Sequence, residues 1–252
     1  MSKKRPFVVS IAGLDPSAGA GVLADIKTFE QLRVYGFAIS TANTIQTENE
    51  FVAIQWTDLD FVLQSVQTIF NSYDIKAVKI GIVPSLEYLK EIIFSIKKHS
   101  PQTKIVWDTV LKSTTEFDFL NIKNQTTLIE ILKEIHLITP NYDEILQLSS
   151  KEINAETTAM LLSKYCPVLL KGGHKPDEIG FDYLYLENDF FRFRPKTKKI
   201  IFEKHGSGCV LSSAITANLA IGQNLKTACE NAKTYTENYL LSTPSKLGHH
   251  YV

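Results

Sequence analysis

The stretch FVVSIAGLDPSAGAGVLADIKTFEQL, residues 7–32, contains the three features from which we infer the fold. Residues 7–12 form a short run of mostly β-branched and apolar residues, which is typical of a parallel strand buried on both faces. A glycine-rich loop follows, and from Gly21 to Leu32 the apolar residues recur at helical spacing. The stretch therefore predicts a buried strand, a loop and a helix in that order.

The same alternation of strand and helix continues along most of the chain. Further strands are predicted at 37–45, 76–82, 104–107, 136–139 and 167–170, and helices at 58–73, 85–98, 126–134, 140–150, 156–164, 208–220 and 225–241. Shorter antiparallel strands are predicted at 183–187, 190–194 and 200–203. Alternating elements indicate a three-layer α/β fold, with a mainly parallel central sheet flanked by helices on both faces. Because no linker or repeat interrupts the pattern, we expect one domain over residues 1–252.

Composition narrows the possible classes of function. The 252 residues include 27 Lys and Arg against 27 Asp and Glu, so no net charge attracts a nucleic acid. The three cysteines, Cys166, Cys209 and Cys229, lack the spacing of a zinc site or a disulfide framework. That usage favours a reducing compartment, so we expect a cytoplasmic protein. No stretch approaches the roughly 20 apolar residues that cross a bilayer, and we expect no membrane partner.

Polar and glycine residues stand where the predicted strands end. In open α/β sheets, ligands bind beyond the carboxyl ends of the strands. The first candidates for a binding site are therefore Gly13, Asp15, Gln46, Gly81, Asp108, Asn141, Lys171 and Gly172.

The segment HGSGC, residues 205–209, directly precedes a predicted apolar helix. Backbone N–H groups at a helix start form an anion site, and Gly206 and Gly208 let the backbone approach a ligand closely. Phosphoryl transfer depends on such electrostatic positioning. Cys209 would lie at the positive end of the helix, where we expect its thiol pKa to be lowered and its thiolate to act as a base. A glycine-rich helix start with a structural cysteine is the alternative.

The loop of residues 13–21 contains Gly19-x-Gly21-x-x-Ala24, which imitates a dinucleotide fingerprint. Five residues separate Gly13 from Gly19, however, and the second strand ends in Gln46 rather than an acid. A loop lining a substrate pocket, with Asp15 or Asp25 reaching a polar group, is the better interpretation. Walker A, zincin and nucleophile-elbow motifs are absent from the sequence, which disfavours P-loop kinases, metalloproteases and α/β-hydrolases.

Taken together, these segments resemble the hydroxymethylpyrimidine and phosphomethylpyrimidine kinases of thiamine biosynthesis, which are relatives of pyridoxal kinases in the ribokinase-like superfamily. The tracts that carry the resemblance are SIAGLDPSAGAGVLADIKTF, TANTIQTEN, VKIG, TPNYDE, KGGH and HGSGCVLSSAITANLA, in that order. It implies a ribokinase-like fold and ATP-dependent phosphorylation of 4-amino-5-hydroxymethyl-2-methylpyrimidine and its monophosphate. It also implies Mg²⁺ and a homodimer.

The resemblance assigns roles to residues of this chain. It implies that Cys209 is the catalytic base and that Gly206 and Gly208 form the anion hole. The substrate-binding residues that we expect are Gly13, Asp15, Ala20, Asp25 and Gln46. The ATP- and phosphate-binding residues that we expect are Asp108, Asn141, Glu144, Lys171 and Lys233, with Asp108 and Glu144 near Mg²⁺ through water.

Several positions depart from the family pattern. Leu14 stands where Ser or Thr is usual, Ala18 where Gly is usual, and Thr109 where Pro is usual. Because these changes could reshape the pocket, a pyridoxal or pyridoxine kinase stays open as the alternative function. A binding module without turnover and a sugar kinase are weaker alternatives, the latter because sugar kinases usually carry Asp at the position of Cys209.

Overall fold

The computed structural model describes residues 5–112, 119–120, 122, 124–149, 153–172, 178–196 and 202–251. Its strands are β1 (Phe7–Leu14), β2 (Tyr35–Gln46), β3 (Phe51–Trp56), β4 (Ile75–Ile80), β5 (Lys104–Trp107), β6 (Leu137–Ile138), β7 (Val168–Gly172), β8 (Phe181–Tyr185) and β9 (Phe190–Phe193). Its helices are α1 (Gly21–Gln31), α2 (Leu59–Ser72), α3 (Leu86–His99), α4 (Gln125–Glu134), α5 (Tyr142–Gln147), α6 (Ala155–Leu162), α7 (Ser207–Ala220) and α8 (Leu225–Leu241).

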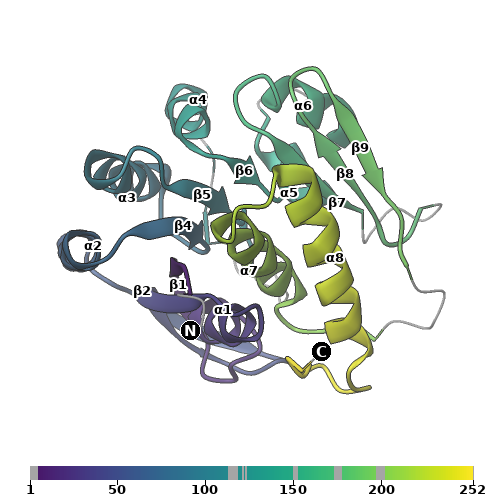
Figure 1. The fold of residues 1–252 in the computed structure, drawn as a ribbon, viewed down its shortest axis with the longest axis horizontal. Helices are drawn as coiled ribbons and strands as arrows, with labels where there is room; N and C mark the ends of the chain where they lie inside the picture. Colours follow the sequence, from purple (N-terminus) through teal and green to yellow (C-terminus); the bar gives the residue numbers. More distant parts are fainter. Residues whose placement is uncertain are drawn as a thin grey trace.

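One sheet runs through all of these strands in the order β3-β2-β1-β4-β5-β6-β7-β8-β9. The six neighbouring strands β2, β1, β4, β5, β6 and β7 pair in parallel. Strand β3 at one edge and the β8–β9 hairpin at the other edge pair antiparallel. Helices lie on both faces of the sheet (Figure 1). The predicted three-layer α/β fold is therefore confirmed.

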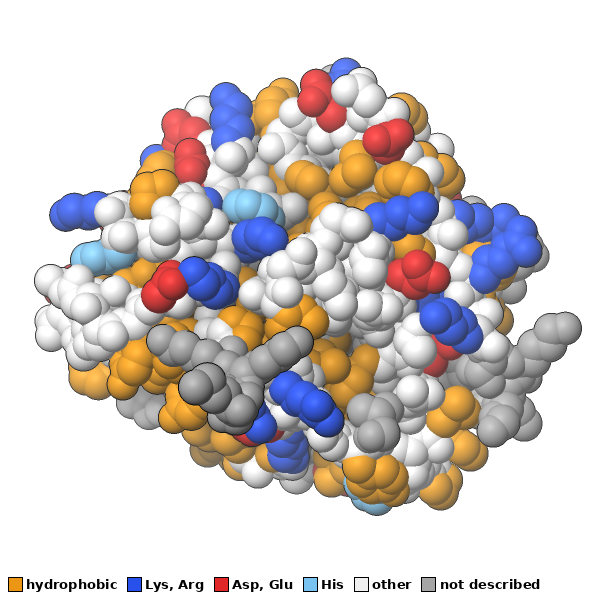
Figure 2. Space-filling model, in the orientation of Figure 1, with side chains coloured by type: hydrophobic (Ala, Val, Ile, Leu, Met, Phe, Trp, Pro, Cys, Tyr) orange, Lys and Arg blue, Asp and Glu red, His pale blue; other side chains and the backbone are white. Residues whose placement is uncertain are grey.

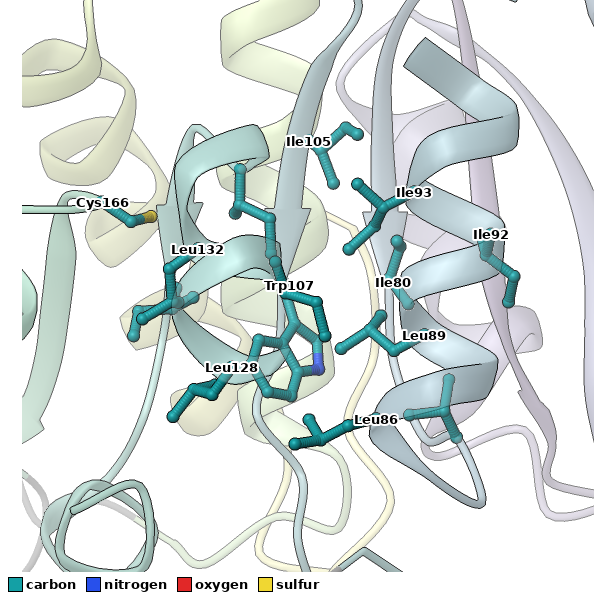
Figure 3. Close-up of a cluster of buried hydrophobic side chains, with 14 of the residues drawn as sticks. Ile80, Leu86, Leu89, Ile92, Ile93, Ile105, Trp107, Leu128, Leu132 and Cys166 are labelled. Atoms are coloured by element: carbon teal, nitrogen blue, oxygen red, sulfur yellow. The ribbon is translucent and has the colours of Figure 1, made fainter. Parts of the chain in front are cut away.

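The largest hydrophobic core lies between the sheet and helices α2 to α6. Trp107 of β5 is 1% exposed. It lies between Leu86 and Leu89 of α3 on one side and Leu128 of α4 on the other (Figure 3). Fully burying side chains of this size contributes about 1.5–3 kcal/mol each. This packing holds β4, β5 and β6 side by side, so their carboxyl ends share one edge of the sheet.

Helix α7 is buried on nearly every side. Ten of its residues are buried, and it lies between the sheet, α1 and α8 (Figure 1). A helix that is apolar all round is expected in the interior. The start of α7 is thereby held against the carboxyl edge of the sheet, where the predicted site residues gather.

Two strand predictions differ from the structure. Strand β3 was not predicted, because the polar turn Thr47–Glu50 before it lacks the glycine or proline that usually marks a hairpin. The strand predicted at 200–203 falls partly outside the described residues, and Phe202 and Glu203 adopt no regular structure.

Surface charge agrees with the neutral composition. On the face shown in Figure 2, Lys and Arg side chains are scattered over the surface with acidic side chains among them. Across the described part of the chain, no helix has both the length and the apolar character needed to cross a membrane.

Candidate active site

The turn before α7 brings the two glycine-containing loops into contact. Gly206, the N-cap of α7, has a φ of 75°, and a Cβ atom there would lie 2.0 Å from the backbone oxygen of Gly19. Only glycine fits this position. The first N–H groups of a helix have no partner inside the helix, so the start of α7 can bind an anion.

Lys171 lies beside the start of α7, at the end of β7. Its Nζ is 3.3 Å from Asp108 Oδ1, 3.5 Å from Glu144 Oε2 and 3.4 Å from the point where a Cβ of Gly208 would stand. Burial would lower the pKa of Lys171, but the carboxylates of Glu144 and Asp108 outweigh burial and raise the pKa. The structure thus brings these four predicted residues together, with the lysine held as a cation.

Asp108 is fully buried, and its carboxylate accepts hydrogen bonds from two neighbouring hydroxyl groups. Thr139 Oγ1 donates to Oδ1 at 3.1 Å, and Ser212 Oγ of α7 donates to Oδ2 at 3.0 Å. Burial alone would raise the pKa of Asp108, but Lys171, Lys79 and the Ser212 hydroxyl outweigh it, and the pKa is lowered. Asp108 therefore carries a negative charge.

Glu144 and Asn141 cap the start of α5 reciprocally. The Asn141 backbone N–H donates to Glu144 Oε2, and the Glu144 N–H donates to Asn141 Oδ1, each at 2.7 Å. Burial raises the pKa of Glu144 despite the opposing charge of Lys171. Two acids thus surround one lysine. Because the acids outnumber the lysine, a phosphate chain could bind here only together with a further cation.

Cys209 is half-buried in the first turn of α7. Burial raises the pKa of its thiol to about 11, and the charges of Asp108 and Asp25 act in the same direction. Lys79 and the hydrogen-bonding Gly21 N–H oppose the rise without cancelling it. The expectation of a lowered thiol pKa is therefore wrong for the free protein.

Asp15 organises the loop that follows β1. It is 1% exposed and accepts hydrogen bonds from Ser17 N at 2.9 Å, Ser17 Oγ at 2.7 Å and Ala20 N at 2.9 Å. Burial would raise the pKa of Asp15, but its bonds to His205, Ser17 and Ala20 outweigh burial and lower the pKa. Its carboxylate shapes the loop, and the substrate contact expected of Asp15 stays a prediction.

The glycines of this loop fill tight spaces. A Cβ on Gly21 would lie 2.1 Å from the Gly13 backbone oxygen, and a Cβ on Gly13 would lie 2.5 Å from Ile82 Cδ1. Ala18 has a φ of 57°, in the left-handed region that costs a non-glycine residue about 1–2 kcal/mol. This strain explains why glycine suits that position.

Asp25 lies in the core of the molecule. Its carboxylate is 2.8 Å from Lys79 Nζ and accepts hydrogen bonds from Ser10 and Ser213, and both Asp25 and Lys79 are fully buried. Asp25 thus pairs with Lys79 in the core, and the substrate contact expected of it stays a prediction.

Gln46 and Lys233 lie on opposite sides of the site. Gln46 is half-buried at the end of β2, where its Nε2 donates to Thr44 Oγ1 at 2.9 Å. Lys233 is 7% exposed, and its Nζ is 2.9 Å from Asp182 Oδ2 and contacts the Gly180 backbone oxygen. This pairing holds the start of β8 against α8, and the phosphate contact expected of Lys233 stays a prediction.

Comparison with known proteins identifies the family. The model of the phosphomethylpyrimidine kinase family matches residues 15–252. The chain belongs to the phosphomethylpyrimidine kinase family. The hydroxymethylpyrimidine/phosphomethylpyrimidine kinase of Aquifex aeolicus is 34% identical over 255 residues, covering 97% of this chain and 98% of that protein. The chain is thus a kinase of this family, as its motifs predicted.

Solved structures related to the family agree. Phosphomethylpyrimidine kinase from Clostridium difficile is 30% identical, with a TM-score of 0.76 over 92% of this chain and 98% of its own. Pyridoxal kinase from Staphylococcus aureus, in complex with AMP-PCP and pyridoxal, is 25% identical, with a TM-score of 0.82 over 95% of this chain and 89% of its own. The fold is therefore shared by kinases of two substrate classes.

Sequence reasoning missed three residues that contact predicted site residues. Lys79 pairs with Asp25, Asp182 pairs with Lys233, and His205 hydrogen-bonds Asp15 at 2.9 Å. Lys79 lies inside the VKIG tract and His205 inside HGSGC, so the motifs contained a signal. Nothing in the sequence indicated which distant acid each would meet.

Proposed function

We propose that this chain transfers the γ-phosphoryl group of ATP to the hydroxymethyl oxygen of 4-amino-5-hydroxymethyl-2-methylpyrimidine, and then phosphorylates the resulting monophosphate. The observation that carries the proposal is the position of Lys171, between Asp108 and Glu144 and beside Gly208 at the start of α7. Phosphoryl transfer is stabilised mainly by such positioning and charge. The substrate names are supported by the family and by the relative in Aquifex aeolicus.

The proposed chemistry uses Cys209 as the proton acceptor. The hydroxymethyl oxygen attacks the γ-phosphorus, ADP leaves, and the hydroxyl proton passes to the Cys209 thiolate. Gly206 and Gly208 leave the backbone of the α7 start open to the transferred group, and Gln46 faces the pyrimidine, since its amide offers both a donor and an acceptor. Gly13 and Ala20 line the pocket, and Asn141 holds Glu144 in place.

Mg²⁺ fits the charges of the nucleotide end. Asp108 and Glu144 would repel the phosphates of ATP without a cation between them. Among the described residues, no group of three or more side chains is arranged to hold a metal directly. Asp108 and Glu144 would therefore hold the Mg²⁺ of MgATP through waters, which Mg²⁺ retains readily.

A pyridoxal or pyridoxine kinase is the second candidate. The pyridoxal-bound structure from Staphylococcus aureus has the same fold, and its substrate is also a hydroxymethyl heteroaromatic. A substrate panel with purified protein and MgATP tests both functions: hydroxymethylpyrimidine, its monophosphate and pyridoxal. We expect the highest kcat/KM for the two pyrimidines. Preference for pyridoxal would replace the proposal with the second candidate.

We further propose that residues 1–252 act as one domain and form a homodimer in the cytoplasm. Exposed apolar side chains on the β2–β3 hairpin support the dimer, because a second copy could cover them: Ile45 is 63% exposed and Val52 is 59% exposed. Light scattering after gel filtration measures the oligomeric state, and a monomer would exclude the dimer.

A further inference from the structure

His205 stands where the two loops of the site meet. It belongs to the turn before α7 and is 8% exposed. Its Nε2 is 2.9 Å from Oδ2 of Asp15, the carboxylate that organises residues 15–20. One hydrogen bond therefore joins the loop after β1 to the anion-binding turn, across 190 positions of sequence.

Close packing strengthens this link. A Cβ on Gly19 would lie 2.7 Å from Cδ2 of His205, and a Cβ on Gly206 would lie 2.0 Å from the Gly19 backbone oxygen. The two loops therefore touch without room for another side chain. Because protein interiors do not deform continuously, a shift of one loop must move the other.

Residues near the C-terminus hydrogen-bond the backbone of His205. The His205 backbone N–H donates to the Lys246 oxygen at 2.9 Å, and Tyr239 Oη donates to the His205 oxygen at 3.4 Å. Within the described part of the chain, the other imidazole nitrogen, Nδ1, has no hydrogen-bond partner. The bond to Asp15 is thus the contact that orients the ring.

We propose that His205 is a positioning residue that keeps Cys209 and the anion-binding turn in register with the loop that holds the hydroxyl substrate. The inference rests on the proposed function, because it assigns the loop after β1 to the hydroxyl substrate and the turn before α7 to the transferred phosphoryl group. Asp15 is the acceptor, so Nε2 carries the hydrogen and donates it. His205 itself exchanges no proton with either substrate.

The test compares His205→Phe with His205→Gln, whose amide nitrogen can occupy the place of Nε2. We expect His205→Phe to lower kcat about 10–100-fold, because a small misplacement of reacting groups has effects of this size. The KM values for MgATP and for the pyrimidine should change less than about threefold, which marks an interaction needed only in the transition state. His205→Gln should recover most of kcat.

His136→Phe is the matched control, since His136 lies just before β6, at the amino end of the strand and away from the carboxyl ends where the site lies. Its kcat should equal that of the wild type, and melting temperatures are measured for all three variants. The proposal is overturned if His205→Gln is as slow as His205→Phe, or if His205→Phe keeps wild-type kcat.

A second measurement separates this inference from the proposed function. Amide hydrogen exchange, followed by mass spectrometry without ligands, reports the two loops directly. Exchange at residues 15–20 and 205–209 should be faster in His205→Phe than in His205→Gln or His136→Phe. Unchanged exchange in His205→Phe would overturn the coupling, whereas absence of pyrimidine turnover by the wild type would overturn only the assignment of substrate.

Discussion

Two lysine–aspartate pairs lie against α7, and they differ in exposure to solvent. The Lys79–Asp25 pair is the closed pair, and the Lys171–Asp108 pair is the open pair. Neighbouring serines of α7 serve one pair each: Ser213 donates to Asp25 of the Lys79 pair, and Ser212 donates to Asp108 of the Lys171 pair. Both side chains of the first pair are fully buried. The side chain of Lys171 keeps 16% of its surface exposed, beside Gly208.

The geometry of the two pairs explains the difference. Lys79 Nζ lies 2.8 and 3.0 Å from the two oxygens of Asp25, so the two charges compensate each other closely. Lys171 Nζ lies 3.3 Å from Asp108 and 3.5 Å from Glu144, a looser arrangement shared between two acids. The first pair holds β4 against α1, whereas we expect Lys171 of the second pair to contact a phosphate in place of one of its acids. We therefore expect exposure, more than residue type, to distinguish a binding pair from a structural one.

Cys209 provides the largest expected effect, because it lies near both pairs and its pKa responds to both. We expect Cys209→Ala to lower kcat about 10²–10⁴-fold, the contribution of a positioned base. MgATP affinity should be unchanged, because the charged cluster is intact. Steady-state kinetics and calorimetry measure the two quantities, and a variant with wild-type kcat would remove Cys209 from the mechanism.

The pKa of Cys209 also predicts a pH dependence. A thiol with a pKa of about 11 is mostly protonated at neutral pH, so the thiolate fraction rises about tenfold per pH unit below that pKa. We therefore expect kcat/KM of the wild type to rise between pH 7 and 9, and the residual activity of Cys209→Ala to lack this rise. A flat wild-type profile would contradict a thiolate base in the free enzyme.

Asp108 of the open pair and the neighbouring Glu144 should control the metal requirement. We expect Asp108→Asn and Glu144→Gln each to raise the Mg²⁺ concentration for half-maximal rate about tenfold, equivalent to ~1.4 kcal/mol. Rates are titrated against free Mg²⁺ at fixed ATP, with Asp60→Asn, an exposed acid of α2, as control. An unchanged metal dependence would show that these acids do not serve the phosphates.

Those two variants should differ in stability. Asp108 is fully buried and paired, so its replacement should lower the melting temperature. Gln can replace Glu in a capping box, so Glu144→Gln should melt close to the wild type.

Gln46 lies away from both pairs, so its replacement should affect the pyrimidine alone. We expect Gln46→Leu to raise the KM of the pyrimidine about 5–150-fold, because an unpaired polar group costs about 1–3 kcal/mol. The KM of MgATP should be unchanged, and Gln55→Leu, an exposed position on the neighbouring strand β3, is the matched control. Equal losses for both substrates would count against Gln46 as the pyrimidine contact.

Sequence reasoning recovered the open pair because its residues share a topological position. Asp108, Asn141 and Lys171 follow parallel strands, whose carboxyl ends meet at one edge of a sheet. The prediction of a shared site therefore required only the order of strands and helices. The glycine turn at residues 205–209 was found for a similar reason, because it directly precedes an apolar helix.

The closed pair was not predicted, because its identity depends on long-range packing. Asp25 and Lys79 are 54 positions apart, and neither neighbourhood indicates the other. The raised pKa of Cys209 has the same origin, since its burial depends on α7 lying between the sheet and other helices. The partner of Lys233 was not predicted either, because Asp182 belongs to the antiparallel hairpin 51 positions away.

MgATP affinity, measured by calorimetry for two variants, tests most directly the distinction between the open and the closed pair. In Lys171→Met the affinity should fall about 10–150-fold, because a hydrogen bond to a charged group contributes about 1.5–3 kcal/mol. In the double variant Asp25→Asn, Lys79→Met, both buried charges are removed together, so no unpaired charge remains in the core. That variant should bind MgATP within about threefold of the wild type, whatever its melting temperature. Wild-type affinity in Lys171→Met, or an equal loss in both variants, would contradict the account.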